Sequence, residues 1–339
     1  MDREIAVLGT GAIGSSIAAD LTRAGHNVLL IDQWPAHIEA MKANGLHVIM
    51  PGKKLHTSVK AFHLCELCNL RPQLDIVFLT SKSYDTCWMV QLIKPYLKPD
   101  GIVVSIQNSL NNEWITPIVG RERNIACVVT LSAELLEPGR VKRVTDQTRT
   151  AFVLGELHGS ITPRLRDVEQ ILSVAGKTEI STNILGAKWS KLVFNSMTPF
   201  DAITLVPMPE LIETTDVLAF SVKLGRESMQ VATALGHNLG PIHGLTAAEF
   251  LDSTDELLEN MLRKFFSITG GKERSHALQD ILRGRRTELE YLNGLVAKKG
   301  QEVNVRTPMN EAVTSLIKQI EQGILKPDRA NLKILEKCS

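Results

Sequence analysis

The sequence predicts an α/β protein, with a doubly wound, mostly parallel sheet over residues 1–183 and helices alone over residues 184–339. The first half alternates short, continuous runs of Val, Ile and Leu with helical patterns, which is typical of parallel strands buried on both faces. After about residue 184 the apolar residues recur at helical spacing, and no strand pattern of any length follows. The chain has 339 residues, enough for two domains of ordinary size.

Buried strands and helices are expected to alternate in the first half. The runs that predict strands are EIAVL, NVLLID, LDIVFLTS, GIVVSIQN and NIACVVTL. The first helix is expected from about residue 11 to 24, ending at Gly25, because glycine commonly ends helices. Pro35 opens a second helix that stops near Gly45, and a third runs towards Pro95.

The pattern changes after residue 130. RVKRVTDQ and TAFVLGEL indicate shorter strands, for which we expect antiparallel pairing. Thr162 is a predicted N-cap with Pro163 at the first helical position, and this helix is expected to end at Gly176. KTEIST follows as a predicted edge strand, so the domain boundary lies near residues 180 to 185.

Composition and charge exclude several classes of protein. The chain is 44% hydrophobic and 22% charged, with a net charge of +1, so nothing favours binding to nucleic acid or to an anionic membrane. No apolar run approaches the roughly 18 residues that cross a bilayer. The N-terminus leads directly into a predicted strand, which argues against a secretory signal and favours a cytoplasmic protein.

The cysteines do not predict a disulfide framework. They are few and odd in number: Cys65, Cys68, Cys87, Cys127 and Cys338. Cys65 and Cys68 form a single CxxC, which is weak evidence for zinc and leaves a redox pair open, although two small helix or loop residues are the favoured interpretation. A reducing cytoplasm fits this usage, and no metal site is predicted.

The strongest motif is a glycine-rich turn between the first strand and the first helix. Gly9, Gly11 and Gly14 have the G-x-G-x-x-G spacing in the strand–turn–helix context that a dinucleotide-binding Rossmann domain requires. Gly9 permits the tight turn, Gly11 lets the backbone approach a pyrophosphate, and Gly14 lets the helix pack on the strand. Ala12 and Ile13 complete the predicted cofactor loop at the helix N-terminus, where backbone N–H groups favour an anion.

Two residues bear on the choice of cofactor. Asp32 ends the second strand, where a carboxylate accepts hydrogen bonds from the adenosine ribose and repels a 2′-phosphate, so NAD(H) is favoured. Lys82 follows the strand LDIVFLTS and is either a contact to an adenosine phosphate or a solvated loop charge. NADP(H) therefore remains an alternative.

Motifs in family order along most of the chain resemble the ketopantoate reductase family. GTGAIG is the cofactor cradle, and SIQNSLNN at 105–112 is similar to the family's Q-N-G-x-x-N loop. KWSKLVFN at 188–195 is similar to its W-x-K-L-x-x-N helix. LQDILRGRRTELEYLNG at 278–294 and RTPMN at 306–310 are similar to its L-Q-D…T-E-[IL]-[DE]-x-[IL]-N-G and T-P-x-N segments.

The resemblance implies both a fold and a reaction. The fold is a Rossmann domain followed by an all-helical domain similar to the C-terminal domain of 6-phosphogluconate dehydrogenase, with the active site in the cleft between them. The reaction is reduction of a branched 2-keto acid, 2-dehydropantoate, to the 2-hydroxy acid by a nicotinamide cofactor, which belongs to pantothenate biosynthesis.

The resemblance also assigns roles to residues. Lys191 is the implied general acid, since hydride transfer to a ketone builds negative charge on oxygen that a cation or proton donor stabilises. Asn195, one turn later, is implied to hold the substrate, and Asn108 to lie near the nicotinamide ribose and the substrate. Spacing alone does not choose Lys191 over Lys188, one turn earlier on the same face.

Glu288 matches the family's acidic site residue. A carboxylate near the catalytic lysine would favour its charged form and orient it. Glu290 points to a different face and is expected to be a surface charge. Asn310, in TPMN, is either part of the site or only a helix cap.

Departures from the family pattern fall on the substrate side. Ser109 replaces the usual glycine of Q-N-G, and Thr198 imperfectly replaces a second asparagine where NSMTPFDA has its proline one residue early. His276, beside Ser275, stands where the family has a serine that helps to hold the substrate carboxylate. It either holds that carboxylate as a cation or indicates a different acid, and taken alone a histidine is more often a surface or packing residue. The predicted substrate residues are therefore Asn108, Asn195, Thr198, His276 and Glu288.

Three functions remain open at this point. The first is a 2-dehydropantoate 2-reductase, and the second is an NAD-dependent dehydrogenase of the same family that acts on a different hydroxy or keto acid. The third is a catalytically silent dinucleotide sensor, which the retained lysine, asparagine and glutamate disfavour. A homodimer is a base-rate expectation only.

Overall fold

The protein is described here from a computed structural model, which covers residues 3–241, 246, 248–249, 254–269 and 274–336. The chain divides into two compact units, Met1–Ile184 and Leu185–Ser339.

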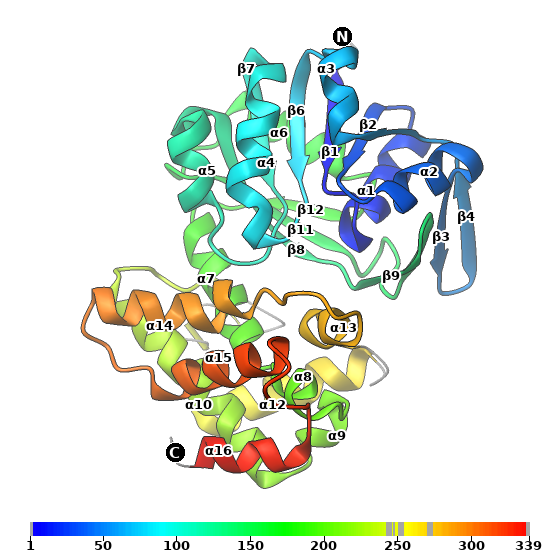
Figure 1. The fold of residues 1–339 in the computed structure, drawn as a ribbon. Coiled ribbons are helices and arrows are strands. Elements are labelled where there is room, and N and C mark those ends of the chain that lie inside the picture. The colour runs from blue at the N-terminus through cyan, green and yellow to red at the C-terminus, as the bar shows by residue number, and fades with distance from the viewer. Residues whose placement is uncertain (1–2, 242–245, 247, 250–253, 270–273, 337–339) are drawn as a thin grey trace. The chain divides into compact units, whose positions relative to one another are not determined.

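An eight-stranded sheet forms the centre of the first unit, in the order β12-β11-β8-β7-β6-β1-β2-β5 (Figure 1). Every neighbouring pair runs parallel except β8 and β11, which are antiparallel, as the sequence predicted for TAFVLGEL. The strands are β1 (Glu4–Leu8), β2 (Asn27–Asp32), β5 (Lys60–His63), β6 (Leu74–Leu79), β7 (Leu97–Ser105), β8 (Asn124–Thr130), β11 (Ala151–Glu156) and β12 (Lys177–Ile180).

Helices cover both faces of this sheet, which confirms the doubly wound α/β prediction. Because side chains alternate along a strand, Ile5 and Val7 of β1 enter one core with α1 and α6, whereas Ala6 and Leu8 enter the other with α4 and α5. The helices of this unit are α1 (Ala12–Arg23), α2 (Pro35–Asn44), α3 (Leu67–Leu70), α4 (Thr86–Ile93), α5 (Asn112–Val119) and α6 (Pro163–Leu172). Helix α6 begins where Thr162 and Pro163 predicted, but it ends four residues before Gly176.

A second, four-stranded sheet was not predicted. Its order is β4-β3-β10-β9, with the strands β3 (Leu46–Met50), β4 (Lys53–Thr57), β9 (Ala133–Glu137) and β10 (Arg140–Arg143). Of these strands, only β10 falls on a run that the sequence marked, RVKR. Strands β4 and β9 are short and have exposed Lys, His or Glu side chains, and β3 pairs with β10 from far along the chain.

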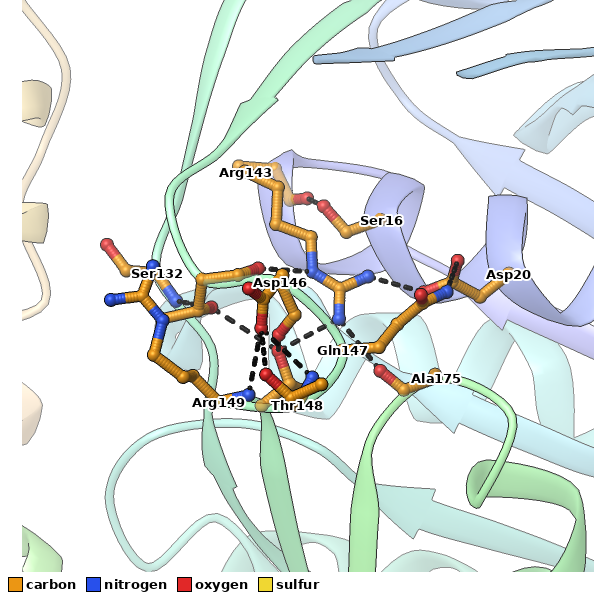
Figure 2. Close-up of polar contacts among 12 residues, drawn as sticks. Ser16, Asp20, Ser132, Arg143, Asp146, Gln147, Thr148, Arg149 and Ala175 are labelled. Atoms are coloured by element: carbon orange, nitrogen blue, oxygen red, sulfur yellow. Dashed lines mark hydrogen bonds and ion pairs between the residues drawn. The ribbon is translucent and has the colours of Figure 1, made fainter. Parts of the chain in front are cut away.

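The buried side chain of Arg143, at the end of β10, connects this second sheet to the rest of the unit (Figure 2). The Arg143 guanidinium forms a fully buried ion pair with Asp20 of α1 and donates hydrogen bonds to Thr150 Oγ1 at 2.8 Å and to the Ala175 carbonyl at 2.7 Å. Gln147 donates to the other Asp20 oxygen at 2.9 Å. Burial raises the pKa of Asp20, whereas the Arg143 and Gln147 contacts lower it. The hydrogen bonds around the ion pair therefore offset part of the cost of burying it.

The second unit is helical throughout the residues that the structure describes, which confirms the prediction from residue 184 onward. Its α-helices are α7 (Ile184–Ser196), α8 (Phe200–Thr204), α9 (Met208–Leu211), α10 (Thr215–Ala234), α12 (Asp255–Thr269), α13 (His276–Leu282), α14 (Asn293–Glu302), α15 (Pro308–Glu321) and α16 (Leu332–Glu336). Within the described part of the chain, no helix is long and apolar enough to cross a membrane.

Candidate active site

The glycine loop of the first unit has the geometry of a phosphate cradle. Gly9 adopts φ +90°, and a Cβ there would lie 2.7 Å from Ser81 Cα. A Cβ on Gly14 would lie 2.4 Å from Thr80 Oγ1, so both positions require glycine. A Cβ on Gly11 would meet nothing within 4 Å, which leaves open space against the backbone at the start of α1.

The N-terminus of α1 faces this space without a protein side chain to cap it. Gly11 is the N-cap and offers no side-chain hydrogen bond, and Ala12 and Ile13, the first two helical residues, are half-buried. The first N–H groups of a helix have no partner within the helix, and its dipole favours negative charge. The loop therefore fits a pyrophosphate.

Asp32 lies at the carboxyl end of β2 and is connected to the same loop. One carboxylate oxygen accepts a hydrogen bond from Thr10 Oγ1 at 3.2 Å, and the other accepts one from the backbone N–H of Trp34 at 2.8 Å. These bonds fix a buried carboxylate that keeps free lone pairs for ribose hydroxyls. Lys82 lies at the start of the 3₁₀ helix η2 (Ser83–Asp85), half-buried, in the loop after β6.

The loop after β7 is fastened to the loop after β6. Gln107 Nε2 donates to the Ser81 carbonyl at 3.0 Å and to Thr86 Oγ1 at 2.9 Å. Asn111 Nδ2 donates to the Asn108 carbonyl at 2.6 Å. Ser109 adopts φ +69°, a conformation that favours glycine, which explains why the family motif has glycine there. Asn108 is thus set on a tightly constrained turn at the carboxyl edge of the sheet.

The structure brings the predicted cofactor residues of the first unit to one edge of the sheet. Thr10, Ser81 and Gln107 join these loops, and the sequence analysis did not single them out. Thr10 lies within the glycine loop, Gln107 is the glutamine of the Q-N motif, and Ser81 directly precedes Lys82, so their positions in these motifs were the available signal.

In the second unit, Lys191 and Asn195 lie on α7 as predicted by their spacing, and Trp189 on the same helix is in the core. The Lys191 side chain is half-buried, and its Nζ lies 5.3 Å from the centroid of the Phe194 ring. Loss of solvation lowers the pKa of Lys191 from 10.5 to about 8. Asn195, one turn later, is 8% exposed.

The other charged candidates of this unit differ in how deeply their side chains are buried. Lys188 is 3% exposed and thus more deeply buried than Lys191. Glu288 is buried and immediately precedes the 3₁₀ helix η5 (Leu289–Tyr291), whereas Glu290 is exposed and pairs with Arg286 at 2.5 Å. For Lys191, burial is the cause of the lowered pKa, and the role of Glu288 beside it stays a prediction.

A buried hydrogen-bond network links α7 to α14, α15 and α10. Asn293 Nδ2 donates to the Ser196 carbonyl at the end of α7 and to Asn310 Oδ1, both at 3.0 Å. Asn310 Nδ2 donates to the Glu227 carboxylate at 2.8 Å, and the backbone N–H groups of Met309 and Asn310 donate to the same carboxylate. Asn310 therefore belongs to a structural network at the start of α15.

The remaining substrate candidates lie at two neighbouring elements, α8 and α13. Thr198 Oγ1 donates to the Asn195 carbonyl at 3.3 Å, just before α8. His276 is the first residue of α13 and is half-buried. Ser275 is the N-cap of that helix and bonds to the buried carboxylate of Asp201 in α8.

In the described ranges, no group of three or more His, Cys, Asp or Glu side chains is placed to hold a metal ion. Cys65, Cys68, Cys87 and Cys127 form no disulfide with one another, and Cys338 lies outside the described residues.

A dinucleotide cradle in one unit and a desolvated lysine with an amide one turn away in the other define a nicotinamide-dependent oxidoreductase. Residues 5–158 match the family described as Ketopantoate reductase PanE/ApbA, and residues 183–321 match Ketopantoate reductase PanE/ApbA C terminal. The chain belongs to the ketopantoate reductase family. It is an oxidoreductase that acts on CH–OH groups, with a nicotinamide dinucleotide as cofactor.

Individual relatives agree with this assignment. The chain is 29% identical to 2-dehydropantoate 2-reductase of Archaeoglobus fulgidus, covering 95% of this chain and 99% of that protein, and 29% identical to that of Pyrococcus horikoshii, covering 94% and 97%. A PanE/ApbA family ketopantoate reductase from Ralstonia eutropha JMP134 is similar with TM-score 0.79 and 27% identity, covering 94% and 99%. D-mandelate dehydrogenase with NADH and anilino(oxo)acetate is similar with TM-score 0.82 and 26% identity, covering 95% and 99%.

Proposed function

We propose that the protein reduces a 2-keto acid to the 2-hydroxy acid, with 2-dehydropantoate as the first candidate substrate and pantothenate biosynthesis as the corresponding pathway. The observation that carries this proposal is Lys191, whose pKa of about 8 makes it a proton donor near neutral pH. Asn195, one helical turn away, is a buried amide of the kind that orients a carbonyl or hydroxyl group.

The cofactor is assigned to residues 1–183 and the acid chemistry to residues 184–339. Gly9, Gly11 and Gly14 would hold the pyrophosphate, and the buried Asp32 carboxylate favours NAD(H) because it would repel a 2′-phosphate. Lys82 leaves NADP(H) as the alternative. When bound, the reduced nicotinamide supplies the hydride.

Side chains of the protein donate the proton and orient the substrate. As the C2 oxygen gains negative charge, the Lys191 ammonium stabilises it and then transfers a proton from Nζ to that oxygen. Asn195 donates its amide N–H to the same oxygen or to a neighbouring hydroxyl. Glu288 and Asn108 are proposed to orient the substrate, and Thr198 and His276 to line its carboxylate side.

A second candidate is an NAD-dependent dehydrogenase of another 2-hydroxy acid. The departures at Ser109, Thr198 and His276 favour it, because they fall on the proposed substrate side and spare Lys191 and Asn195. The similarity to D-mandelate dehydrogenase with NADH shows that this fold serves an aryl hydroxy acid in at least one relative.

Initial rates with 2-dehydropantoate and with benzoylformate, each with NADH and with NADPH at low concentration, separate the candidates. Faster turnover of 2-dehydropantoate supports the first candidate, and faster turnover of benzoylformate supports the second. A preference for NADH assigns the adenosine site to Asp32, and a preference for NADPH assigns it to Lys82. No turnover of any 2-keto acid, with the cofactor bound, refutes the proposed function.

A further inference from the structure

The imidazole of His37 is almost completely buried and connects three elements of the first unit. His37 lies near the start of α2 and is 1% exposed. Its Nδ1 accepts a hydrogen bond at 2.9 Å from the backbone N–H of Gly139, in the turn between β9 and β10. Its Nε2 lies 3.2 Å from the hydroxyl oxygen of Ser15, in α1. The ring therefore links α2 both to α1 and to the second sheet.

These partners select one tautomer of the ring. A backbone N–H can only donate, so Nδ1 carries no proton and the neutral ring has its proton on Nε2. Nε2 then donates to Ser15 Oγ, and Ser15 Oγ donates at 2.7 Å to the backbone carbonyl of Thr10. Burial lowers the pKa of His37 and so favours the neutral ring, although the Asp32 carboxylate raises it. The result is a relay of hydrogen bonds from His37 through Ser15 to Thr10.

The relay ends on the glycine loop. Thr10 is the second residue of the GTGAIG turn and is fully buried, and its Oγ1 donates to Asp32 at 3.2 Å. The Thr10 carbonyl accepts its bond from Ser15, so the orientation of the Ser15 hydroxyl bears directly on the loop. His37 fixes that orientation, because the Nε2 proton occupies a lone pair of Ser15 Oγ and leaves the hydroxyl proton for the carbonyl.

A second contact joins His37 to the carboxylate that is expected to bind the adenosine ribose. The His37 ring stacks on the indole of Trp34, with ring centroids 5.6 Å apart and an interplanar angle of 17°. Trp34 donates its backbone N–H to Asp32 at 2.8 Å. The Gly139 turn is fitted closely to the same helix, since a Cβ on Gly139 would lie 3.2 Å from Ala40 Cβ. One buried ring thus supports both the glycine loop and the residue that holds Asp32.

We propose that His37 and Ser15 are positioning residues of the cofactor site, which hold Thr10 and Asp32 in the arrangement that binds the pyrophosphate and the ribose of a nicotinamide dinucleotide. Neither residue needs to touch the cofactor. The inference rests on the cofactor assignment within the proposed function, and it holds for any 2-keto acid. A residue outside the G-x-G-x-x-G motif, His37, then helps to set the affinity for the cofactor.

Two substitutions of His37 separate the relay from the bond to the second sheet. In His37→Asn, the amide oxygen can replace Nδ1 as acceptor for the Gly139 N–H, but the donor to Ser15 is lost. In His37→Gln, the amide nitrogen can replace Nε2 as that donor.

The readout is the dissociation constant for NADH or NADPH, whichever the wild type binds more tightly, measured by fluorescence titration without keto acid. It is expected to rise about tenfold in His37→Asn and in Ser15→Ala, and less than about twofold in His37→Gln. In a Ser15→Ala background, His37→Asn should raise it no further, because the relay is already broken.

A matched control removes a buried ion pair elsewhere in the same unit. Glu156, at the end of β11, pairs with Arg164 of α6 at 2.6 Å. Glu156→Gln should lower the midpoint of urea denaturation and leave the dissociation constant unchanged. In ¹⁵N-histidine-labelled wild type, the His37 signals are assigned by their loss in His37→Gln, and they should show the proton on Nε2 at neutral pH.

Four results overturn the inference. They are an unchanged dissociation constant in Ser15→Ala, equal increases in His37→Asn and His37→Gln, an increase in Glu156→Gln as large as that in His37→Asn, and a proton on Nδ1 of His37 in the wild type. If His37→Asn does not fold, Ser15→Ala and the NMR signals decide. If the wild type binds neither NADH nor NADPH, the cofactor assignment itself fails and the inference fails with it, whereas the four results above leave that assignment intact.

Discussion

Lys191 gives the most specific prediction, because desolvation lowers its pKa from 10.5 to about 8. That shift means that the folded protein disfavours the charged form of Lys191 by about 3 kcal/mol relative to the neutral form. Only the protonated amine can donate a proton to the substrate oxygen during reduction. We therefore expect kcat/KM for reduction to be constant below pH 8 and to fall about tenfold per pH unit above it. Oxidation of the hydroxy acid needs the neutral amine and should rise with pH up to the same value.

Variants of α7 test whether this ionisation belongs to Lys191. Lys191→Ala is expected to lower turnover by about 10²–10⁴. Lys191→Arg keeps a cation that does not lose its proton in this range, so the break near pH 8 should disappear along with most of the activity. Lys188→Ala, one turn earlier on the same helix, is the matched control and should retain the break. The reasoning is refuted if the break in the pH profile is still present in Lys191→Arg. It is also refuted if Lys188→Ala loses the break while Lys191→Arg keeps it.

The same shift has a consequence for stability. Because the pKa of Lys191 in the folded protein lies below its unfolded value, the folded state binds fewer protons between pH 8 and 10.5. The stability contribution of this group therefore rises with pH through that window, and the ammonium destabilises the fold below it. Lys191→Met should be inactive yet more stable at pH 7, by about 1–3 kcal/mol in urea denaturation.

Three further predictions concern single residues. Ser109→Gly should stabilise the protein by about 0.5–1 kcal/mol in urea denaturation, because Ser109 has φ +69°, whereas Ser109→Ala, which keeps the strained Cβ, should give no gain. Arg143→Leu should destabilise by about 3–5 kcal/mol because it leaves the Asp20 carboxylate buried without its ion pair, and adding Asp20→Leu should recover much of the loss; a double variant as unstable as the single would contradict this. The pKa of Asp201 is raised from 3.8 to about 6, so the folded state binds more protons and this group's stability contribution falls by about 3 kcal/mol as pH rises through that window. Asp201→Asn should remove that pH dependence, and an unchanged pH profile of stability would contradict the assignment.

Local patterns in the sequence predicted the elements that carry the proposed chemistry. The turn around Gly11 and the face of α7 that holds Lys191 and Asn195 each depend on spacing within about one helical turn, which a sequence displays directly. Strands β1, β2, β6, β7 and β8 were equally visible because each contains a continuous apolar run, whereas the parallel strand β5, with the sequence KAFH, was not predicted.

Features that depend on long-range pairing could not be predicted in this way. Strand β3 pairs with β10 through His47 and Arg140, far apart along the chain, and of these two strands the sequence marked only β10. Asp201 and Glu227 belong to no motif, and each acquires its role only by contact with a helix cap far along the chain. The expectation that Glu288 would favour the charged form of Lys191 stays a prediction, and burial is the cause of the lowered pKa of Lys191.

The most direct measurement is transfer of deuterium from cofactor to product. The wild type is supplied with a 2-keto acid and with the 4-deuterated reduced cofactor, prepared as each stereoisomer, and the 2-hydroxy acid is analysed by mass spectrometry. Hydride transfer to the keto carbon predicts one deuterium at C2 of the product with one of the two stereoisomers, and product formation reduced by about 10²–10⁴ in Lys191→Ala. Product without deuterium from either stereoisomer, or undiminished product formation in Lys191→Ala, would contradict the account.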